Sequence, residues 1–144
     1  MARDNAAQHP DRPISISAVS TPHAPGPGGP YSQAVTAGDF VFLSGQRPVD
    51  AVTAVIPGNF AEQAHAVLRN LVQLAAAAGS SAGQVVKVTV HLADLKFFDE
   101  FNAVYQEYFT PPYPSRTTVG SQLRGILVEV DAIAVRHPRG TAQS

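Results

Sequence analysis

The segment PYPSRTTV, residues 112–119, places an arginine at the start of a run of strand-forming residues and directly behind two prolines. A guanidinium group is always charged, and its planar fork matches the two oxygens of a carboxylate. Pro114 restricts the backbone just ahead of Arg116, so the arginine emerges from a stiff connection. Arg116 is therefore a candidate anchor for a small carboxylate; the alternative is a solvated arginine on an edge strand.

A second candidate is Glu129, an acid inside the apolar segment ILVEVDAIAV. If Arg124-Gly125 form the turn of a hairpin, the register puts several polar residues on one face of the sheet: Arg116, Thr118, Gly120, Glu129 and Asp131. Arg116 and Glu129 would then lie roughly 13 Å apart, at about 3.3 Å per residue. They would form no direct salt bridge, so a ligand or a neighbouring subunit has to lie between them. The alternative is an exposed acid on an open face.

Three weaker candidates lie elsewhere. The segment Ser44-Gly45-Gln46 ends a strand, and a glycine there lets a ligand approach the backbone closely. Tyr31 follows a loop rich in glycine and proline, where it could close a pocket or simply pack. Asn102 lies on an expected helix, where most asparagines are solvated.

The composition excludes several classes of function. The 144 residues include no cysteine, which rules out disulfides, thiolate metal sites and a cysteine nucleophile, and the five histidines form no His-x-x-x-His pair, so no metal site is expected. The formal net charge of -1 disfavours nucleic-acid binding. There is no Gly-x-Ser-x-Gly elbow and no phosphate-binding loop. No membrane span or signal peptide is apparent, so the protein is expected to be cytoplasmic.

The pattern of elements predicts an α+β fold. Strands are expected at 14–19, 39–49, 83–94, 115–122 and 126–136, and helices after Asn59 up to Gly79 and over 96–109. The predicted order is three strands, helix, strand, helix, two strands, where one of the first three strands is counted without bounds and strands 115–122 and 126–136 form a hairpin. That order gives a six-stranded mixed sheet with two helices covering one face. Residues 14–137 should form one domain, flanked by tails at 1–13 and 138–144.

The other face of the sheet, with Thr118, Glu129, Asp131 and some apolar groups, is left uncovered. Charged residues make up only 15% of the chain, against about 25% in typical soluble domains. A mixed open face of this kind suits packing against copies of the same chain, and the alternative is a solvated face.

Several motifs occur together in the order found in one family: GPGGPYSQAV, VFLSGQRPV, the long segment from AEQAHAVLRN to VYQEYF, PYPSRTTV and VEVDAIAV. In these the chain resembles the RidA family of reactive imine and enamine deaminases, also called YjgF-type or L-PSP proteins, over residues 20–137. The resemblance implies a chorismate-mutase-like fold and a homotrimer whose open sheet faces form a central barrel, with active sites in the clefts between subunits.

The resemblance also implies a reaction and its residues. The family hydrolyses 2-imino acids such as 2-iminobutanoate and 2-iminopropanoate to 2-keto acids and ammonia, without a cofactor or metal. Arg116 matches the arginine that binds the substrate carboxylate, with Glu129 and Tyr31 as further catalytic positions. Other matching cleft positions are Ser44, Gly45, Asn102 and Thr118. Thr118 stands where some members have cysteine, and the connection before Glu129 lacks the Leu-Pro turn of many members.

Three alternatives stay open. A trimer could bind small carboxylates for regulation without turnover. A related deaminase could act on another carbon–nitrogen substrate, such as an aminoacrylate. Ribonuclease or translation-inhibitor activity, attributed to some relatives, is disfavoured by the near-neutral charge and the lack of a histidine pair.

Overall fold

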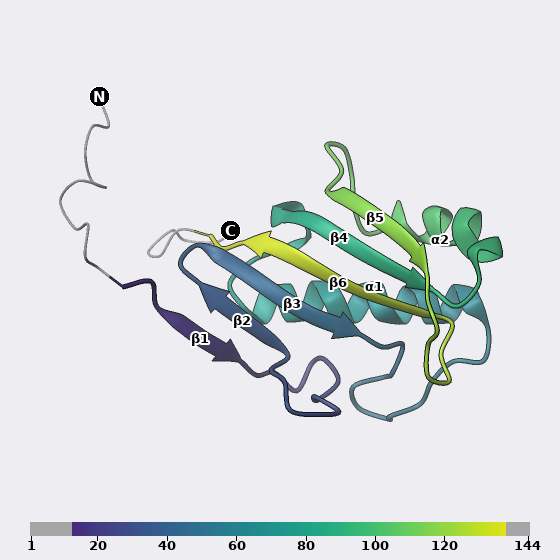
Figure 1. Cartoon of the computed structure of the whole chain (residues 1–144), viewed down its shortest axis with the longest axis horizontal. Helices are drawn as coiled ribbons and strands as arrows, with labels where there is room; N and C mark the ends of the chain where they lie inside the picture. Colours follow the sequence, from purple (N-terminus) through teal and green to yellow (C-terminus); the bar gives the residue numbers. More distant parts are fainter. Residues whose placement is uncertain (1–12, 138–144) are drawn as a thin grey trace.

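The computed structural model describes residues 13–137, so the expected tails, except Pro13, lie outside the described residues. Figure 1 shows three strands, a helix, a strand, a second helix and two strands along the chain, as predicted. The elements are β1 Ile16–Val19, β2 Ala34–Ala37, β3 Phe40–Gln46, α1 Phe60–Ala77, η1 Ala82–Gln84, β4 Val85–Leu92, η2 Leu95–Phe97, α2 Phe98–Tyr105, β5 Ser115–Gly120 and β6 Val128–Val135. No helix among these is long and apolar enough to cross a membrane.

The six strands form one mixed sheet in the order β1-β2-β3-β6-β4-β5. β4 and β5 are parallel, and the other neighbouring strands are antiparallel. The predicted hairpin of β5 and β6 is therefore wrong, because β4 lies between them. The segment from β4 through α2 to β5 forms a crossover unit, which brings β5 back parallel to β4. β6 then pairs with the other side of β4 and completes the sheet against β3.

The true pairing changes which residues share a face. Arg116 is paired with Val88 and Thr118 with Val90, and both valines are buried under the helices. Side chains alternate along a strand, so Arg116 and Thr118 belong to the helix-covered face. Glu129 is paired with His91 on the opposite, open face. The expectations that Arg116 shares a face with Glu129, and that Thr118 lies on the uncovered face, are both wrong.

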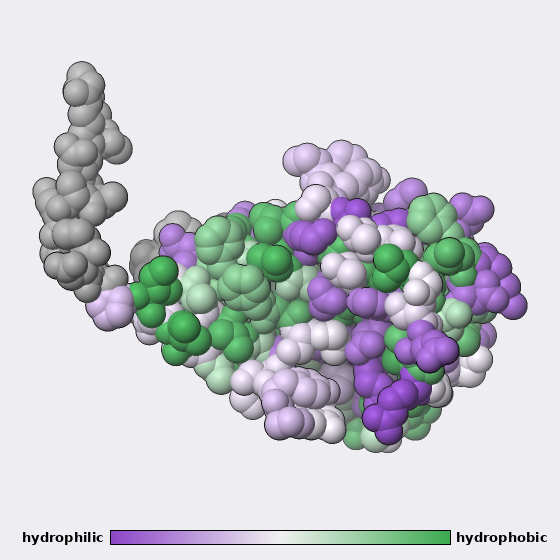
Figure 2. All heavy atoms as spheres, viewed as in Figure 1, coloured by the Kyte–Doolittle hydropathy of each residue, from purple (hydrophilic) through white to green (hydrophobic). Residues whose placement is uncertain are grey.

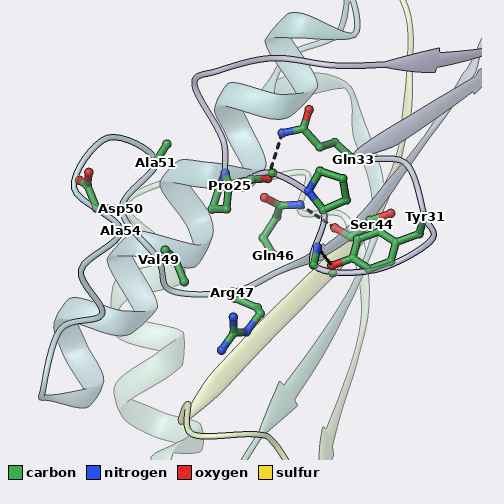
Figure 3. Close-up of a pocket in the computed structure, with 14 residues that line it drawn as sticks. Pro25, Tyr31, Gln33, Ser44, Gln46, Arg47, Val49, Asp50, Ala51 and Ala54 are labelled. Atoms are coloured by element: carbon green, nitrogen blue, oxygen red, sulfur yellow. Dashed lines mark hydrogen bonds between the residues drawn. The ribbon is translucent and has the colours of Figure 1, made fainter.

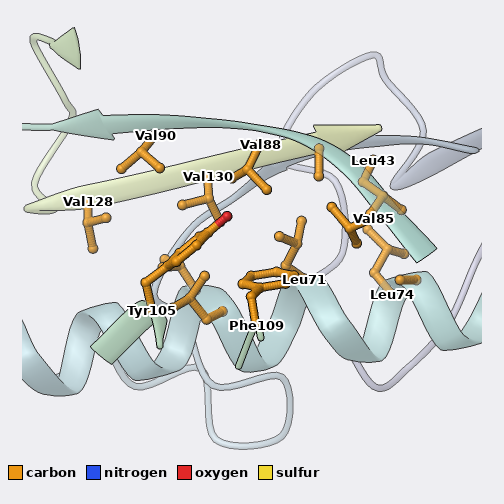
Figure 4. Close-up of a cluster of buried hydrophobic side chains, with 14 of the residues drawn as sticks. Leu43, Leu71, Leu74, Val85, Val88, Val90, Tyr105, Phe109, Val128 and Val130 are labelled. Carbon is orange, nitrogen blue, oxygen red and sulfur yellow. The ribbon is translucent and has the colours of Figure 1, made fainter. Parts of the chain in front are cut away.

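Helix α1 forms as its sequence predicts. The Asn59 side chain accepts a hydrogen bond from the Glu62 N–H at 2.9 Å, which caps the first turn. Beyond the last turn Gly79 has φ +83°, a left-handed conformation that glycine adopts without strain. The buried stripe of α1 packs on the inner face of the sheet, as Figure 4 shows for Leu71 and Leu74 beneath the valines of β4 and β6.

Helix α2 is shorter than the predicted helix over 96–109. A 3-10 turn precedes it, and the chain leaves the helix after Tyr105. Phe101 and Tyr105 still lie in the core with Phe109, so the apolar stripe was correctly identified although the boundaries were not.

The open face of the sheet is divided into an apolar end and a polar end. At the apolar end Ile16, Phe40 and Phe42 keep 72%, 49% and 45% of their surface exposed, and green side chains gather over β1, β2 and β3 in Figure 2. At the polar end His91 contacts Ser121 at 2.8 Å and Asp131 at 3.6 Å. The open face is thus mixed in character, as expected.

Candidate active site

Arg116 lies on β5 and points toward α2. Its Nη2 donates a hydrogen bond to Asn102 Oδ1 at 2.6 Å, and its guanidinium lies 4.8 Å from the centre of the Tyr105 ring. Phe98 and Phe101 lie on the same side, 5.7 and 5.6 Å from the guanidinium carbon. Helix α2 thus supplies both an amide that orients the fork and an aromatic surface that holds it, because cations are attracted to ring faces.

The charge of Arg116 has no carboxylate partner among residues 13–137, where the two basic side chains within 4.0 Å of a carboxylate oxygen are both histidines. Burial lowers the pKa of Arg116, while Tyr105 acts in the opposite direction. Burial raises the pKa of Tyr105, so its phenol is neutral and does not neutralise the arginine. An arginine stays protonated in such surroundings. A partly desolvated cation with only a neutral hydrogen-bond partner is suited to bind an anion.

A hollow opens beside this arginine at the edge of the sheet. It is lined by Asn102, Tyr105, Gln106, Tyr113, Pro114 and Arg116. Pro114, directly before β5, thus forms part of the wall that surrounds the arginine. Thr118 follows two residues later on the same face of β5. Three of the predicted site residues, Arg116, Asn102 and Thr118, therefore form one group.

The other four predicted residues form a second group around the end of β3. The pairing of β3 with β6 is irregular between Leu43 and Gln46, which interrupts the alternation at Ser44 and Gly45. A Cβ on Gly45 would lie 2.7 Å from Glu129 Oε1, so glycine is what allows Glu129 to rest against the backbone. The Ser44 hydroxyl donates to the Ser32 carbonyl at 2.6 Å. Ser44 therefore holds the loop that carries Tyr31.

Tyr31 closes this second group. Its hydroxyl accepts a hydrogen bond from the Gly28 N–H at 2.9 Å, which folds the glycine-proline loop around the ring. The ring is half exposed and lines a hollow with Ser44 and Gly45, whose opposite side is formed by Val49 and the loop around Asp50 and Ala54 (Figure 3). Tyr31 also lines an adjoining hollow together with Glu129.

A buried glutamine that the sequence did not identify as important organises this loop. The Gln33 side chain accepts from the Thr21 N–H at 2.8 Å and donates to the carbonyls of Thr21, Ala24 and Pro25 at 3.1, 3.2 and 2.9 Å. A buried amide with this many partners fixes an otherwise irregular backbone. The only signal in the sequence was a glutamine just before an apolar run.

One chain does not bring the two groups together. Arg116 and Glu129 lie on opposite faces of the sheet, on strands separated by β4 and three residues apart along it. With about 4.8 Å between strands and about 3.3 Å per residue, their backbones are roughly 14 Å apart. Within residues 13–137 no group of three or more His, Cys, Asp or Glu side chains could hold a metal ion.

The model of the family described as endoribonuclease L-PSP matches residues 21–136. The chain belongs to this family. The resemblance to RidA (L-PSP) proteins drawn from the motifs is therefore confirmed.

Relatives within the L-PSP family carry several names. A RutC family protein of Pyrococcus horikoshii is 43% identical over 82% of this chain and 96% of its own length. The 2-iminobutanoate/2-iminopropanoate deaminase of Bos taurus is 41% identical over 86% of this chain and 93% of its own length. The solved structure of Escherichia coli TdcF with bound serine has 39% identity and a TM-score of 0.79, covering 84% of this chain and 99% of that chain. The fold, with its six-stranded sheet and two helices, is thus that of its L-PSP relatives.

Proposed function

We propose that this protein is a hydrolytic deaminase that converts 2-imino acids and their enamine tautomers, such as 2-iminobutanoate and 2-iminopropanoate, to 2-keto acids and ammonia. The observation that carries the proposal is Arg116, a cation held by Asn102 and three aromatic rings without a carboxylate partner among the described residues. It fits the carboxylate common to all of these substrates. Deaminase relatives at about 40% identity support the same reaction.

The complete site is proposed to form between subunits of a homotrimer. The open sheet faces would form the interior of a central barrel, which buries the exposed apolar end around Phe40 and Phe42. Each cleft would then combine Arg116, Asn102 and Thr118 of one subunit with the second group from its neighbour. The separation of the two groups on opposite faces of one chain supports this arrangement, because Arg116 belongs to one group and Glu129 to the other.

In this cleft the carboxylate of the substrate would accept two parallel hydrogen bonds from Arg116. The guanidinium has five N–H donors, so it can retain its bond to Asn102 and still bind the substrate. The Gly45 N–H is a further donor toward the same anion. These contacts hold the imine carbon in a fixed position, and positioning alone accelerates a reaction between bound groups substantially.

The reaction then needs a proton acceptor and a proton donor. Glu129 would accept a proton from water as the water oxygen bonds to the imine carbon, helped by a backbone carbonyl near Thr118. The C–N bond of the tetrahedral product breaks as the nitrogen takes up protons and leaves as ammonia, giving the 2-keto acid. Tyr31 accepts from Gly28, so its own O–H remains free to donate toward the departing nitrogen. The imine carbon is already electrophilic, so the chemistry requires no cofactor.

The proposal is tested by direct measurement of imine hydrolysis. A threonine dehydratase would generate 2-iminobutanoate, and keto-acid formation would be followed with the wild type, Arg116→Ala and Arg69→Ala. Arg69 is an exposed arginine on α1 and serves as the matched control. We expect the wild type and Arg69→Ala to accelerate hydrolysis and Arg116→Ala to lose at least tenfold in rate.

A carboxylate-binding protein without turnover is the main alternative. It would bind 2-oxobutanoate through Arg116 yet leave the rate of imine hydrolysis at its spontaneous value. Binding without acceleration would therefore contradict the deaminase proposal and favour that alternative.

A further inference from the structure

Two arginines outside the predicted site share a hollow with two of its residues. Arg47 and Arg124 line the same hollow as Tyr31 and Glu129. Arg47 follows β3 directly, and Arg124 lies in the connection between β5 and β6. The Arg47 Nη2 reaches the Arg124 carbonyl at 3.5 Å, so the two segments meet at this point.

The charges in this hollow do not cancel. The residues that line it include two arginines and one acidic residue, Glu129. Within residues 13–137 neither Arg47 nor Arg124 lies within 4.0 Å of a carboxylate oxygen. The lining residues therefore carry an excess of one positive charge, even with Glu129 ionised. A concave wall with excess positive charge raises the local concentration of anions.

Buried polar side chains of α1 hold the backbone of Arg47 and the end of the connection that contains Arg124. Asn70 Nδ2 donates to the carbonyls of Arg47 and Val49 at 3.1 and 2.9 Å. Gln63 Oε1 accepts from the Leu127 N–H at 2.8 Å and so holds the connection that contains Arg124. Both amides are almost fully buried. Arg47 therefore extends from a fixed backbone, and Arg124 from a connection that is fixed at its end, which reduces the entropy lost when they bind a ligand.

We propose that Arg47 and Arg124 make the site select 2-imino acids that carry a second carboxylate on the side chain. This inference rests on the proposed function. The carboxylate next to the imine carbon would bind Arg116 of the neighbouring subunit, and the second one would lie near Arg47 and Arg124. The chemical class is a dicarboxylic 2-imino acid with a short side chain, such as 2-iminosuccinate or 2-iminoglutarate. Tyr31 and Glu129 line the same hollow as the two arginines. In the proposed cleft they would face the imine carbon between the two anchors.

The test compares acidic and neutral imines in one assay. Amino-acid oxidases would generate imines from aspartate, glutamate, alanine and 2-aminobutanoate. The kcat/KM ratio of acidic to neutral imine would be measured for the wild type and for the double variant Arg47→Gln/Arg124→Gln. Arg69→Gln on α1 is the matched control. We expect the wild type to favour at least one acidic imine about tenfold or more, and the double variant to lose most of that preference.

Ionic strength adds a second readout. The preference of the wild type should fall as salt is raised from about 0.01 to 0.5 M, because exposed charges are screened. A wild type that hydrolyses neutral imines and shows no preference for acidic ones would overturn the inference and leave the proposed function intact. So would a double variant with an unchanged ratio.

Failure of the proposed function gives a different result. In that case the wild type would accelerate the hydrolysis of neither acidic nor neutral imines, and no preference between them could be measured during turnover. Calorimetric binding of 2-oxoglutarate and 2-oxobutanoate then decides the charge recognition by itself. If the wild type binds the dicarboxylate more tightly and the double variant does not, Arg47 and Arg124 recognise the second carboxylate. Equal binding of both acids by the wild type would refute this recognition.

Discussion

The contact between Gly45 and Glu129 gives a sharp prediction for Gly45→Ala. The added Cβ would lie 2.7 Å from Glu129 Oε1, 3.2 Å from its Cδ and 3.4 Å from its Cγ. Ordinary contact begins at 3.4 Å, so the carboxylate oxygen has to retreat by 3.4 − 2.7 = 0.7 Å. The obstacle is the end of a flexible, partly exposed side chain, so Glu129 can rotate away without disturbing the sheet.

We expect this change to reduce activity and to leave stability almost unaltered. A displacement of about 1 Å in a catalytic group costs on the order of 100-fold in rate, so a loss of about 10- to 100-fold in kcat/KM is expected. Gly45 is not among the glycines with positive φ. Alanine at a compatible position changes stability by only about 0.4–1 kcal/mol, usually favourably.

The assay is hydrolysis of 2-iminobutanoate together with a thermal melt. Gly83→Ala is the matched control, because a Cβ there meets nothing within 4 Å. If Gly45→Ala melts like the wild type and keeps its activity within about twofold, the position of Glu129 against Gly45 does not matter for catalysis. A large drop in melting temperature would show instead that the clash cannot be relieved by the side chain.

Three further predictions concern buried side chains. Gln33→Leu leaves three carbonyls and one N–H of the glycine-proline loop without their partner, and should lower the free energy of unfolding in a urea melt by about 2–4 kcal/mol. A loss of less than about 1 kcal/mol would contradict the role given to Gln33. Tyr105→Phe removes a buried hydroxyl that has no partner among the described residues, so it should be neutral or stabilising by up to about 1 kcal/mol and should retain activity. Tyr105→Leu, in contrast, should reduce activity because it removes the ring beside Arg116. Leu71→Ala opens a cavity at a fully buried position of α1 and should cost about 2–5 kcal/mol by chemical denaturation, with a smaller loss indicating that the core collapses around it.

Local patterns in the sequence predicted local structure well. The Asn59 cap and the apolar stripe of α1 depend on neighbouring residues, and the alternation of β4 depends on burial of one side. The order of elements followed from these patterns. The motifs also identified the candidate site residues, which the structure places in two compact groups.

Pairing of the last two strands could not be predicted in the same way. A hairpin of β5 and β6 and the observed crossover use the same residues in the same elements. The choice depends on whether β5 pairs with β4 or with β6. These two pairings compete, and the pairing with β4 joins segments that are distant in the sequence. That choice reversed the face on which Arg116 and Thr118 lie. Likewise Tyr105 appeared in the sequence only as part of a helical stripe, and its position beside Arg116 depends on the crossover.

Mixed trimers test most directly the claim that Arg116 and Glu129 of different subunits form one site. Arg116→Ala and Glu129→Ala chains, each inactive alone, would be co-expressed with different tags and purified through both. In any cyclic trimer with both chains, one cleft of three combines an intact Arg116 with an intact Glu129, so we expect about one third of wild-type activity. Mixed trimers no more active than either variant alone would contradict the shared cleft.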